Sequence, residues 1–391
     1  MPYFDNAATT FPKPDAVIES MADFMRAAAG NPGRGAHRLA LAASEAIDEA
    51  RVKVARFFGM PDPMRVVFCM NCTAALNLAM HGLLKPGDHV VTSSMEHNAI
   101  IRPLHTLAQQ GVDVTRVECA QDGSWTVEQI LAAMRPETRL VVLSHASNVT
   151  GTIQPIEALG LELRSHGALF LVDAAQTAGV LPLDMEAYGI DLLALPGHKE
   201  LLGPTGTGAL IVGKQAVLRP FMQGGTGTRS EEEWQPENVP EGFEVGTLNS
   251  VGIVGLSAGI SYINEIGLDR IRTHQIELMT RLLEGLATVP GLTVYGPAQS
   301  SRQVGVVSVN LDHWEPMDLG IALDQEYDIA VRTGLHCSPL AHRTIGTYPT
   351  GTVRFSPGYS TTTAEIDQAI EALHHLATQW QRGVPLVGMV D

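Results

Sequence analysis

The chain has little of what several protein classes require. Only 4 cysteines occur in 391 residues, too few for the disulfide framework of a small secreted protein. The 26 basic residues are outnumbered by 42 acidic ones, and the net charge of −16 argues against nucleic acid or an anionic membrane as a partner. No apolar run approaches the roughly 20 residues of a membrane helix. Since the first residues also lack the features of a signal peptide, we expect a cytoplasmic protein.

The cysteines are also poorly placed for a metal. Cys69 and Cys72 form a CxxC pair, whereas Cys119 and Cys337 are isolated from each other. Because a zinc site of this type needs a second pair, we expect no metal and interpret the CxxC pair as small buried side chains. Hydrophobic residues make up 45% of the chain and charged residues 17%, which is typical of a well-packed globular protein.

Short apolar runs alternate with helical segments through the first half of the chain. This alternation predicts an α/β fold with a mostly parallel sheet covered by helices on both faces. In such sheets the reactive groups gather at the carboxyl ends of the strands. The expected strands are 65–69, 89–94, 114–119, 139–145, 168–173, 192–196 and 208–213, and the expected helices between them are 73–84, 98–111, 127–134 and 156–167.

The pattern differs outside this region. A helix is expected over 44–58, with Gly59 as its stop. After about residue 250, amphipathic helices over 267–286 and 361–380 flank short strands, which indicates a smaller α+β domain. Polar, glycine-rich 224–246 is expected to be a loop between the two. We expect a large domain over 15–260 and a small domain over 261–391 that includes the N-terminal segment 1–14.

Unusual polar residues follow four of the expected strands. Asp173 ends a run without other charges, where a carboxylate needs a fixed cation or caps the next turn. Asn148 lies in a polar turn. Cys72 and Thr73 open a helix, which is either an anion site or an ordinary cap. Lys199 precedes a glycine-rich turn that leads into another strand.

Lys199 has three interpretations, as a phosphate-binding lysine, a lysine that traps a carbonyl covalently, or a solvated loop residue. The phosphate-binding loop of nucleotide enzymes is excluded by order, because there the glycines precede the lysine and a helix follows. Taken with Asp173 and the helix start at Thr73, the pattern suggests a pyridoxal phosphate pocket. In such a pocket the lysine forms a Schiff base, the aspartate pairs with the ring nitrogen and the helix start binds phosphate.

A series of motifs runs nearly end to end through the chain. The motifs are YFDNAATT, MEHNAIIRP, SNVTGTIQP, LVDAAQTAG, GHKELLGPTGTGAL, FEVGTLNSVGIVGL, VRTGLHCSPLAH and GTVRFSPGYSTTTAEID. With these motifs the sequence resembles the class V branch of the fold-type-I pyridoxal phosphate enzymes, specifically the cysteine desulfurase and selenocysteine lyase family. The resemblance implies a large PLP-dependent-transferase domain with a mostly parallel central sheet, plus a smaller C-terminal α+β domain.

The resemblance implies roles around the cofactor ring. Lys199 would hold pyridoxal phosphate covalently and shuttle the α-proton of the substrate. His97 would stack on the ring, and Asp173 would pair with the ring nitrogen. Gln176 and Asn148 would approach the ring hydroxyl.

The resemblance also implies a phosphate site and a homodimer. Thr73, the backbone of Cys72 and His198 would hold the phosphate, and Thr247 would reach the phosphate of the neighbouring subunit. Two positions depart from the family pattern. Pro196 stands where many relatives have a serine or threonine, so one phosphate hydroxyl is missing, and Ala74 replaces an acidic residue that some members carry.

Substrate binding and the choice of reaction depend on the second half of the chain. The resemblance implies that Arg354 grips the substrate carboxylate, and Arg34 and His37 match an active-site segment. Cys337 would be the nucleophile, because Arg332 and His336 beside it can favour the thiolate, unless it is a loop cysteine without a role.

These positions predict a cysteine desulfurase. It converts L-cysteine to L-alanine, takes the sulfur as a persulfide on Cys337 and passes it to an acceptor, which can be a protein. Three alternatives stay open. A selenocysteine lyase would act on L-selenocysteine with the same residues. An aminotransferase or carbon–sulfur β-lyase of class V would leave Cys337 a bystander, and a protein that only binds the cofactor would have no activity.

Overall fold

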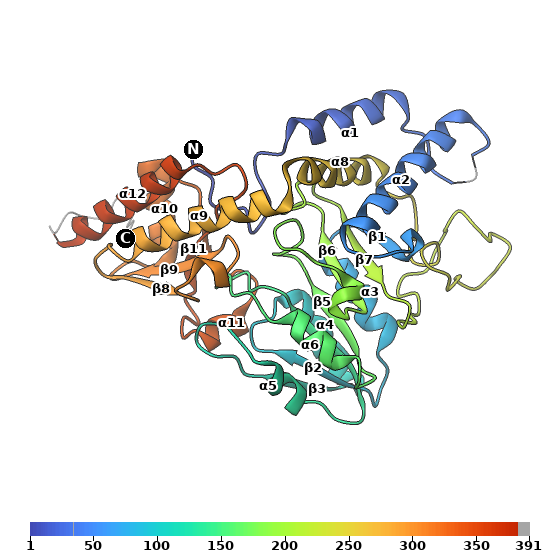
Figure 1. The fold of residues 1–391 in the computed structure, drawn as a ribbon, viewed down its shortest axis with the longest axis horizontal. Coiled ribbons are helices and arrows are strands. Elements are labelled where there is room, and N and C mark those ends of the chain that lie inside the picture. Colours follow the sequence, from blue (N-terminus) through green and yellow to red (C-terminus); the bar gives the residue numbers. More distant parts are fainter. Residues whose placement is uncertain (34, 382–391) are drawn as a thin grey trace, which may run out of the picture.

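The computed structural model describes residues 1–33 and 35–381, in which two separate sheets form two packed regions (Figure 1). Within these residues the larger sheet has seven strands in the order β1-β7-β6-β5-β4-β2-β3. Its strands are β1 (Val66–Cys69), β2 (His89–Ser93), β3 (Asp113–Val117), β4 (Thr138–Ser144), β5 (Leu169–Asp173), β6 (Leu192–Pro196) and β7 (Gly208–Val212).

The predicted mostly parallel sheet is confirmed. Neighbours from β3 through β2, β4 and β5 to β6 all run parallel, and only β7 and β1 add antiparallel pairs at one edge. Consecutive residues of a strand face opposite sides of the sheet: Val142 packs with α3 (Cys72–Leu83) and α4 (Asn98–Gln109), and Leu143 packs on the other side. Because both faces are covered, strands β5 and β6 are apolar throughout their buried length, apart from the final Asp173 of β5.

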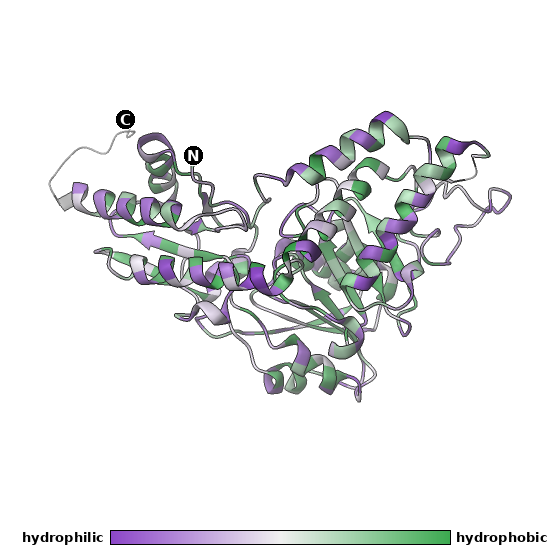
Figure 2. Ribbon diagram, turned by 45° about the horizontal axis from the view of Figure 1, so that its top comes forward, coloured by the Kyte–Doolittle hydropathy of each residue, from purple (hydrophilic) through white to green (hydrophobic). Residues whose placement is uncertain are grey.

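Helices from several parts of the chain cover the second face. The strands of the large sheet are coloured mostly as hydrophobic (Figure 2). The helices of the large region other than α3 and α4 are α1 (Asp15–Ala27), α2 (Arg38–Phe57), α5 (Val127–Ala132), α6 (Ile156–Leu163), α7 (Met185–Tyr188) and α8 (Ser250–Ile266). Helix α8 packs against both α1 and α2, and α2 also contacts β1 and contributes side chains to the core of the large sheet. A 3₁₀ turn, Pro63–Arg65, leads into β1.

The smaller region is an antiparallel sheet backed by helices. Among the described residues it has four strands in the order β10 (Arg332–Gly334), β11 (Thr352–Phe355), β9 (Val307–Leu311) and β8 (Leu292–Tyr295). Its core also includes Phe4, so the start of the chain packs here. The helices around it are α9 (Leu268–Leu286), α10 (Pro316–Tyr327), α11 (Pro339–Thr344) and α12 (Thr363–Gln381), with a 3₁₀ turn at Ser300–Arg302.

Helix α9 connects the two regions. Ile271 near its start belongs to the core of the large sheet, whereas Leu278 and the residues after it belong to the core of the small one. The expected boundary near residue 260 stays a prediction. Arg34 and residues 382–391 of the expected small domain lie outside the described residues.

Most expected elements lie where the sequence pattern placed them. Helix α2 differs, because it begins at Arg38 and not at residue 44, with the Nδ1 of His37 accepting a hydrogen bond from Ala40 N. The stretch 224–246 contains no helix or strand, as expected. Among the described residues, no single helix could span a membrane by length and composition, although the pair α8 and α9, bent by 81°, passes that test together. The described residues also contain no group of three or more potential metal ligands.

Candidate active site

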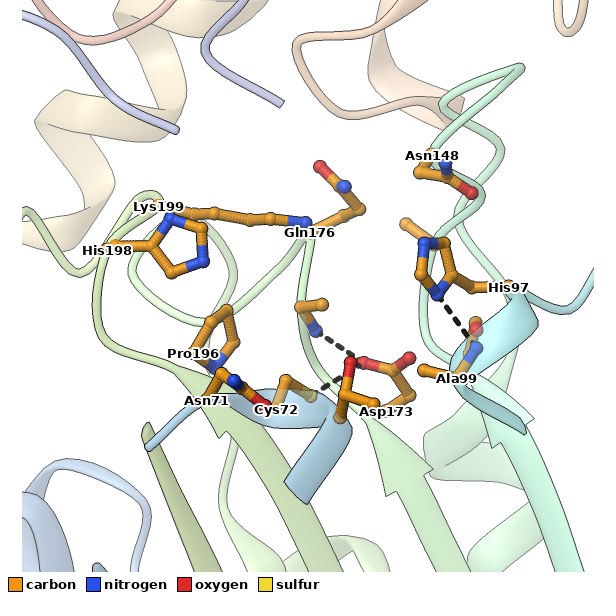
Figure 3. Close-up of a pocket in the computed structure, with 14 residues that line it drawn as sticks. Asn71, Cys72, His97, Ala99, Asn148, Asp173, Gln176, Pro196, His198 and Lys199 are labelled. Atoms are coloured by element: carbon orange, nitrogen blue, oxygen red, sulfur yellow. Dashed lines mark hydrogen bonds between the residues drawn. The ribbon is translucent and has the colours of Figure 1, made fainter. Parts of the chain in front are cut away.

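A cavity of about 170 Å³ lies at the carboxyl ends of the central strands (Figure 3). Strands β4, β5 and β6 end here, and the ends of these strands together with the loops that follow them supply most of the lining. This is the edge at which parallel sheets gather ligand groups. The lining residues are Asn71, Cys72, Thr73, His97, Ala99, Ser144, Ala146, Asn148, Asp173, Ala175, Gln176, Pro196, His198 and Lys199.

Lys199 follows β6 by three residues, and its side chain extends across the cavity toward Gln176 (Figure 3). Burial lowers the pKa of Lys199, an effect that the nearby charge of Asp173 partly opposes. The neutral amine is therefore reached at lower pH than for a solvated lysine. Such an environment does not fit the interpretation of Lys199 as a solvated loop residue.

Asp173 is the last residue of β5 and is buried. Its Oδ1 accepts hydrogen bonds from Ala175 N at 2.9 Å and from Cys72 Sγ at 3.4 Å. Burial raises the pKa of Asp173, because the charged carboxylate loses water. A cation placed against this carboxylate would favour the ionised form.

His97 caps α4 and presents its ring to the cavity. Its Nδ1 accepts a hydrogen bond from Ala99 N at 3.0 Å, so the proton of the neutral ring is on Nε2. Burial, with the nearby positive charge of Lys199, lowers the pKa of His97 to about 4. The ring is therefore an uncharged flat surface at neutral pH, suited to stacking.

The start of α3 offers hydrogen-bond donors to the cavity. The side chain of Asn71 caps the helix at Ala74 N, at 2.8 Å, and the first intrahelical bond in this turn is made by Ala75. The N–H groups of Cys72 and Thr73 precede that bond and are available to an anion. Nearby, the buried Nδ1 of His198 has no hydrogen-bond partner among the described residues.

Glu96, next to His97, is a buried acid that the sequence analysis did not single out. Its carboxylate accepts bonds from the hydroxyl of Ser93, from Ser144 N at 2.8 Å and from Ser144 Oγ at 2.7 Å. It thereby ties the end of β2 to the end of β4 below the cavity. Burial raises the pKa of Glu96 to about 7. The signal in the sequence is the position of Glu96 inside the MEHNAIIRP motif, three residues after β2.

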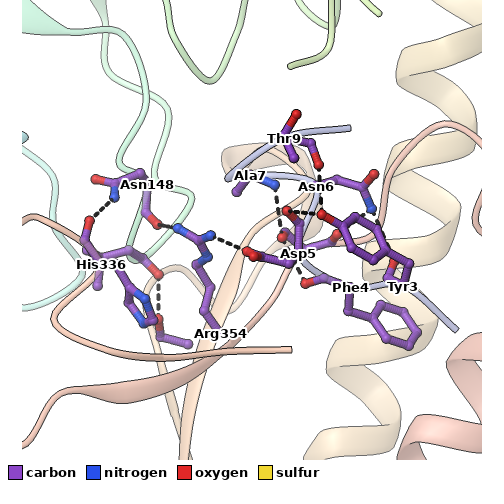
Figure 4. A network of polar contacts seen from close by, with 12 residues as sticks. Tyr3, Phe4, Asp5, Asn6, Ala7, Thr9, Asn148, His336 and Arg354 are labelled. Carbon is purple, nitrogen blue, oxygen red and sulfur yellow. Dashed lines mark hydrogen bonds and ion pairs between the residues drawn. The ribbon is translucent and has the colours of Figure 1, made fainter. Parts of the chain in front are cut away.

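Arg354 lies on β11, buried between the two regions (Figure 4). One terminal nitrogen, Nη2, is 2.7 Å from Asp5 Oδ1, and the other, Nη1, donates to the carbonyl of Asn148 at 3.0 Å. Burial lowers the pKa of Arg354, and the charge of Asp5 opposes this effect. Asp5 was also missed from the sequence, although it lies inside the YFDNAATT motif.

Cys337 is exposed on the loop between β10 and α11. Both His336 and Cys337 have positive φ angles, 47° and 58°, which non-glycine residues rarely adopt. The loop is held by Asn148, whose Nδ2 donates to His336 O at 2.7 Å and whose Oδ1 accepts from Ser338 Oγ at 2.8 Å. Asn98 N also donates to Cys337 O at 2.8 Å. This strained loop presents the thiol in one fixed place.

The expectation that His336 adds positive charge beside Cys337 is wrong. Its ring is buried and donates to or accepts from Thr352 Oγ1 at 3.0 Å. Burial lowers the pKa of His336 well below its usual value, and the positive charge of Arg354 adds to this effect. The imidazole is therefore neutral at neutral pH, and positive charge near this loop comes from arginine side chains.

Comparison with known proteins agrees with this site. The profile of the aminotransferase class-V family matches residues 2–369. The chain belongs to this family. It is 38% identical over 382 residues to a probable cysteine desulfurase of Methanothermobacter thermautotrophicus, covering 96% of this chain and 94% of that protein.

Two solved structures support the same relationship. An apo structure of cysteine desulfurase from Thermococcus onnurineus NA1 superposes with a TM-score of 0.90 at 34% identity, covering 96% of this chain and 94% of that one. The cysteine desulfurase CsdA of Escherichia coli, in an S-sulfonic acid form, gives 0.86 at 28% identity, with 97% and 94% covered. The predicted class V membership, the fold and the likeness to cysteine desulfurases are confirmed.

Not every residue predicted for this class V site lines the cavity. Gln176 does, and its Nε2 also donates to Ala7 O at 3.2 Å. Asn148 does too, but its polar atoms serve the Cys337 loop. Thr247 is exposed in a separate groove, and His37 is an exposed helix cap. Their roles stay predictions.

Proposed function

We propose that this chain is a pyridoxal phosphate-dependent cysteine desulfurase, which converts L-cysteine to L-alanine and receives the sulfur as a persulfide on Cys337. The observation that carries the proposal is the exposed thiol of Cys337 on a strained loop, which Asn148 joins to the buried Arg354. Relatives named cysteine desulfurase that align over nearly the whole chain support it.

The cavity residues fit pyridoxal phosphate. The family uses this cofactor, which when bound supplies an electron sink for the α-carbon of an amino acid. Lys199 would hold it covalently, and the buried carboxylate of Asp173 would pair with its ring nitrogen. The N–H groups of Cys72 and Thr73 would hold its phosphate, with the unpartnered Nδ1 of His198 beside them.

Two residues prepare the amino acid. Arg354 binds the substrate carboxylate with the donors that Asp5 and Asn148 leave available. Lys199 takes the α-proton on Nζ, and burial favours this role because it lowers the pKa of the amine toward neutrality. Neutral His97 keeps a flat, uncharged face on the cofactor side of the site.

Cys337 receives the sulfur. Its thiolate attacks the sulfur atom of the substrate, so that an S–S bond forms as the bond from sulfur to the β-carbon breaks. The electron pair of that bond stays with carbon, which takes up a proton, and the product is alanine. A thiol of an acceptor, which we propose is a protein, then removes the outer sulfur from Cys337.

The experiment is intact-protein mass after one turnover with cysteine and no reductant. We expect one added sulfur atom on wild type, mapped to Cys337, and none on Cys337→Ser, because a hydroxyl cannot hold a persulfide. Cys119→Ser is the matched control and should load sulfur normally. Alanine release by Cys337→Ser at the wild-type rate, or pyruvate and ammonia as products, would replace the proposal by the lyase alternative. Higher turnover of selenocysteine than of cysteine would favour a selenocysteine lyase.

We further propose that the chain acts as a homodimer in which Thr247 reaches the phosphate of the neighbouring site. Thr247 is exposed at a groove where large apolar side chains also reach the surface, among them Met70, Phe221 and Met222. Such a patch is typical of a protein interface. Light scattering should give twice the chain mass of 41.9 kDa, and a monomer at micromolar concentration would contradict the proposal.

A further inference from the structure

The arginine assigned to the substrate carboxylate already holds a carboxylate of its own chain. Arg354 has five N–H donors, of which one meets Asp5 Oδ1 and one meets the carbonyl of Asn148 (Figure 4). Its Nε is buried without a partner among the described residues. The guanidinium is therefore only partly satisfied, and its charge is already balanced by Asp5.

The backbone of Asp5 is held beside Arg354, because Asp5 and its neighbours are attached to the strand of Arg354. Asp5 pairs in parallel with Ser356, two residues after Arg354. Asn6 Nδ2 donates to Ser356 O at 2.9 Å, and Ala7 N donates to Ser356 Oγ at 3.0 Å. These contacts place the negative charge of Asp5 within reach of Arg354.

The same N-terminal segment continues to the turn of Lys199. The carbonyl of His198 accepts bonds from Thr10 N at 3.1 Å, from Thr9 Oγ1 at 3.1 Å and from Lys13 Nζ at 2.6 Å. One stretch of chain therefore connects Arg354 with the residue that precedes Lys199. Asp5 lies within this stretch, at the side of the site that the substrate carboxylate must reach.

Asp5 is also the only partner in an ion pair with Arg354 among the described residues. Its side chain is 24% exposed, whereas that of Arg354 is 2% exposed. The facing residue across the β10–β11 pair is Arg332, a second cation. A carboxylate at this position therefore offsets local positive charge and at the same time repels any second carboxylate that approaches Arg354.

We propose that Asp5 competes with the carboxylate of the substrate and of the product for Arg354. This competition weakens the binding of both molecules to Arg354 and speeds the release of alanine. The inference rests on the proposed function, in which Arg354 receives that carboxylate. Because Asp5 does not touch the reacting atoms, it acts through Arg354 and tunes affinity, not chemistry.

The test replaces Asp5 by asparagine in the holoenzyme. The amide oxygen can still accept from Nη2 of Arg354, so the guanidinium keeps its orientation while the negative charge is lost. We expect the dissociation constant of L-alanine, measured by calorimetry, and the KM for cysteine both to fall on the order of tenfold. L-Alaninamide, which has no carboxylate, should gain no affinity. A merely structural defect would weaken binding, and it would not tighten it.

Asp328→Asn is the matched control. Asp328 pairs at 3.2 Å with the N-terminal amine, which belongs to the same N-terminal segment as Asp5 but not to the contacts of Arg354. Asparagine tolerates the positive φ of 57° at position 328. Alanine binding should equal that of wild type. Unchanged or weaker alanine binding in Asp5→Asn, at an unchanged unfolding temperature, would overturn the proposal.

A second variant covers the case in which Asp5→Asn is unstable. Asp5→Glu keeps the charge, so its alanine binding should stay within about threefold of wild type; a tenfold tightening there would also overturn the proposal. Failure of the proposed function is seen separately, because it requires that wild type make no alanine from cysteine, whereas alanine binding needs no turnover.

Discussion

Two buried arginines of this chain have different surroundings. Arg51 on α2 is paired with Glu244 through both carboxylate oxygens, at 2.8 and 2.9 Å, and both side chains are almost fully covered. Arg354 meets a single oxygen of Asp5, and that carboxylate is partly exposed.

This difference distinguishes an ion pair that stabilises the fold from an arginine that can bind a ligand. Glu244 also accepts a bond from Phe68 N at 2.7 Å, and the guanidinium of Arg51 lies over the ring of Phe68, so little room is left for a ligand. The pair anchors the stretch before Thr247 to α2 and β1. Arg354 is buried as well, and the Nε atoms of both arginines lack a partner among the described residues. Arg354 differs because its Nη atoms meet only one oxygen of Asp5 and the carbonyl of Asn148, beside the Cys337 loop. We expect that substitutions at Arg354 and Asp5 change ligand affinity, and that substitutions at Arg51 and Glu244 cost stability.

The largest effect is expected for Lys199→Ala. Turnover should fall on the order of 10⁴-fold or more, because no other amine lines the cavity among the described residues to hold the cofactor and move the α-proton. When both proteins are compared without cofactor, the unfolding temperature should not fall, since a buried ammonium that burial disfavours is removed. Steady-state kinetics and calorimetric melting measure the two quantities. An active variant would refute the central assignment of the site.

Glu244→Gln tests the ion pair between Arg51 and Glu244. It leaves the charge of Arg51 buried without its counter-ion, and the free energy of unfolding should fall by about 3–5 kcal/mol. Urea unfolding measures this, and kcat per folded molecule should stay near that of wild type. The control is Asp367→Asn, because Asp367 forms a two-oxygen pair with Arg281 in an exposed position and should give no measurable change. Equal effects of the two substitutions would remove the distinction based on burial.

Arg354→Lys tests the ion pair between Arg354 and Asp5. Lysine keeps the charge but cannot bind a carboxylate through two parallel N–H groups. The KM for cysteine should rise on the order of tenfold to a hundredfold, with a smaller change in kcat and an intact fold. Initial rates over a wide range of cysteine concentrations separate the two constants. A pure loss of stability with an unchanged KM would place Arg354 in the same class as Arg51.

The smallest effect concerns pH. His145 is buried beside the end of β5, and burial lowers its pKa to about 3, below the ordinary value of 6.5. Below pH 6.5 the unfolded chain binds a proton that the folded chain does not, so stability is lost as pH falls through this window toward 3. His145→Gln should lose less stability than wild type between pH 7 and 5.5, by about 1.4 kcal/mol. Parallel urea titrations at the two pH values measure the difference, and identical pH slopes would contradict it.

The sequence predicted the large sheet well because its signals are local. A buried parallel strand must be apolar along its length, and β5 carries that pattern in the four residues before Asp173 and β6 in all five of its residues. Polar residues directly after such strands must lie at one edge of the sheet, which is why Asp173 and Lys199 could be assigned to one pocket. The motif series then selected the family, and the comparisons confirmed it.

The remaining features depend on contacts between distant residues. Asp5 and Arg354 are 349 positions apart, and only the packing of the N-terminal segment beside β11 brings their charges together. Burial keeps His336 neutral, so it does not supply the positive charge that was expected beside Cys337. A short sequence motif carries no information about burial. Asn148 likewise has a motif position that suggests the cofactor, but its hydrogen bonds go to the Cys337 loop. Residue order thus determined the sheet and the chemical groups at its edge, because those follow from periodicity along the chain. The charge state and partners of each group were decided by the tertiary structure, because they depend on loss of water and on neighbours far away in sequence.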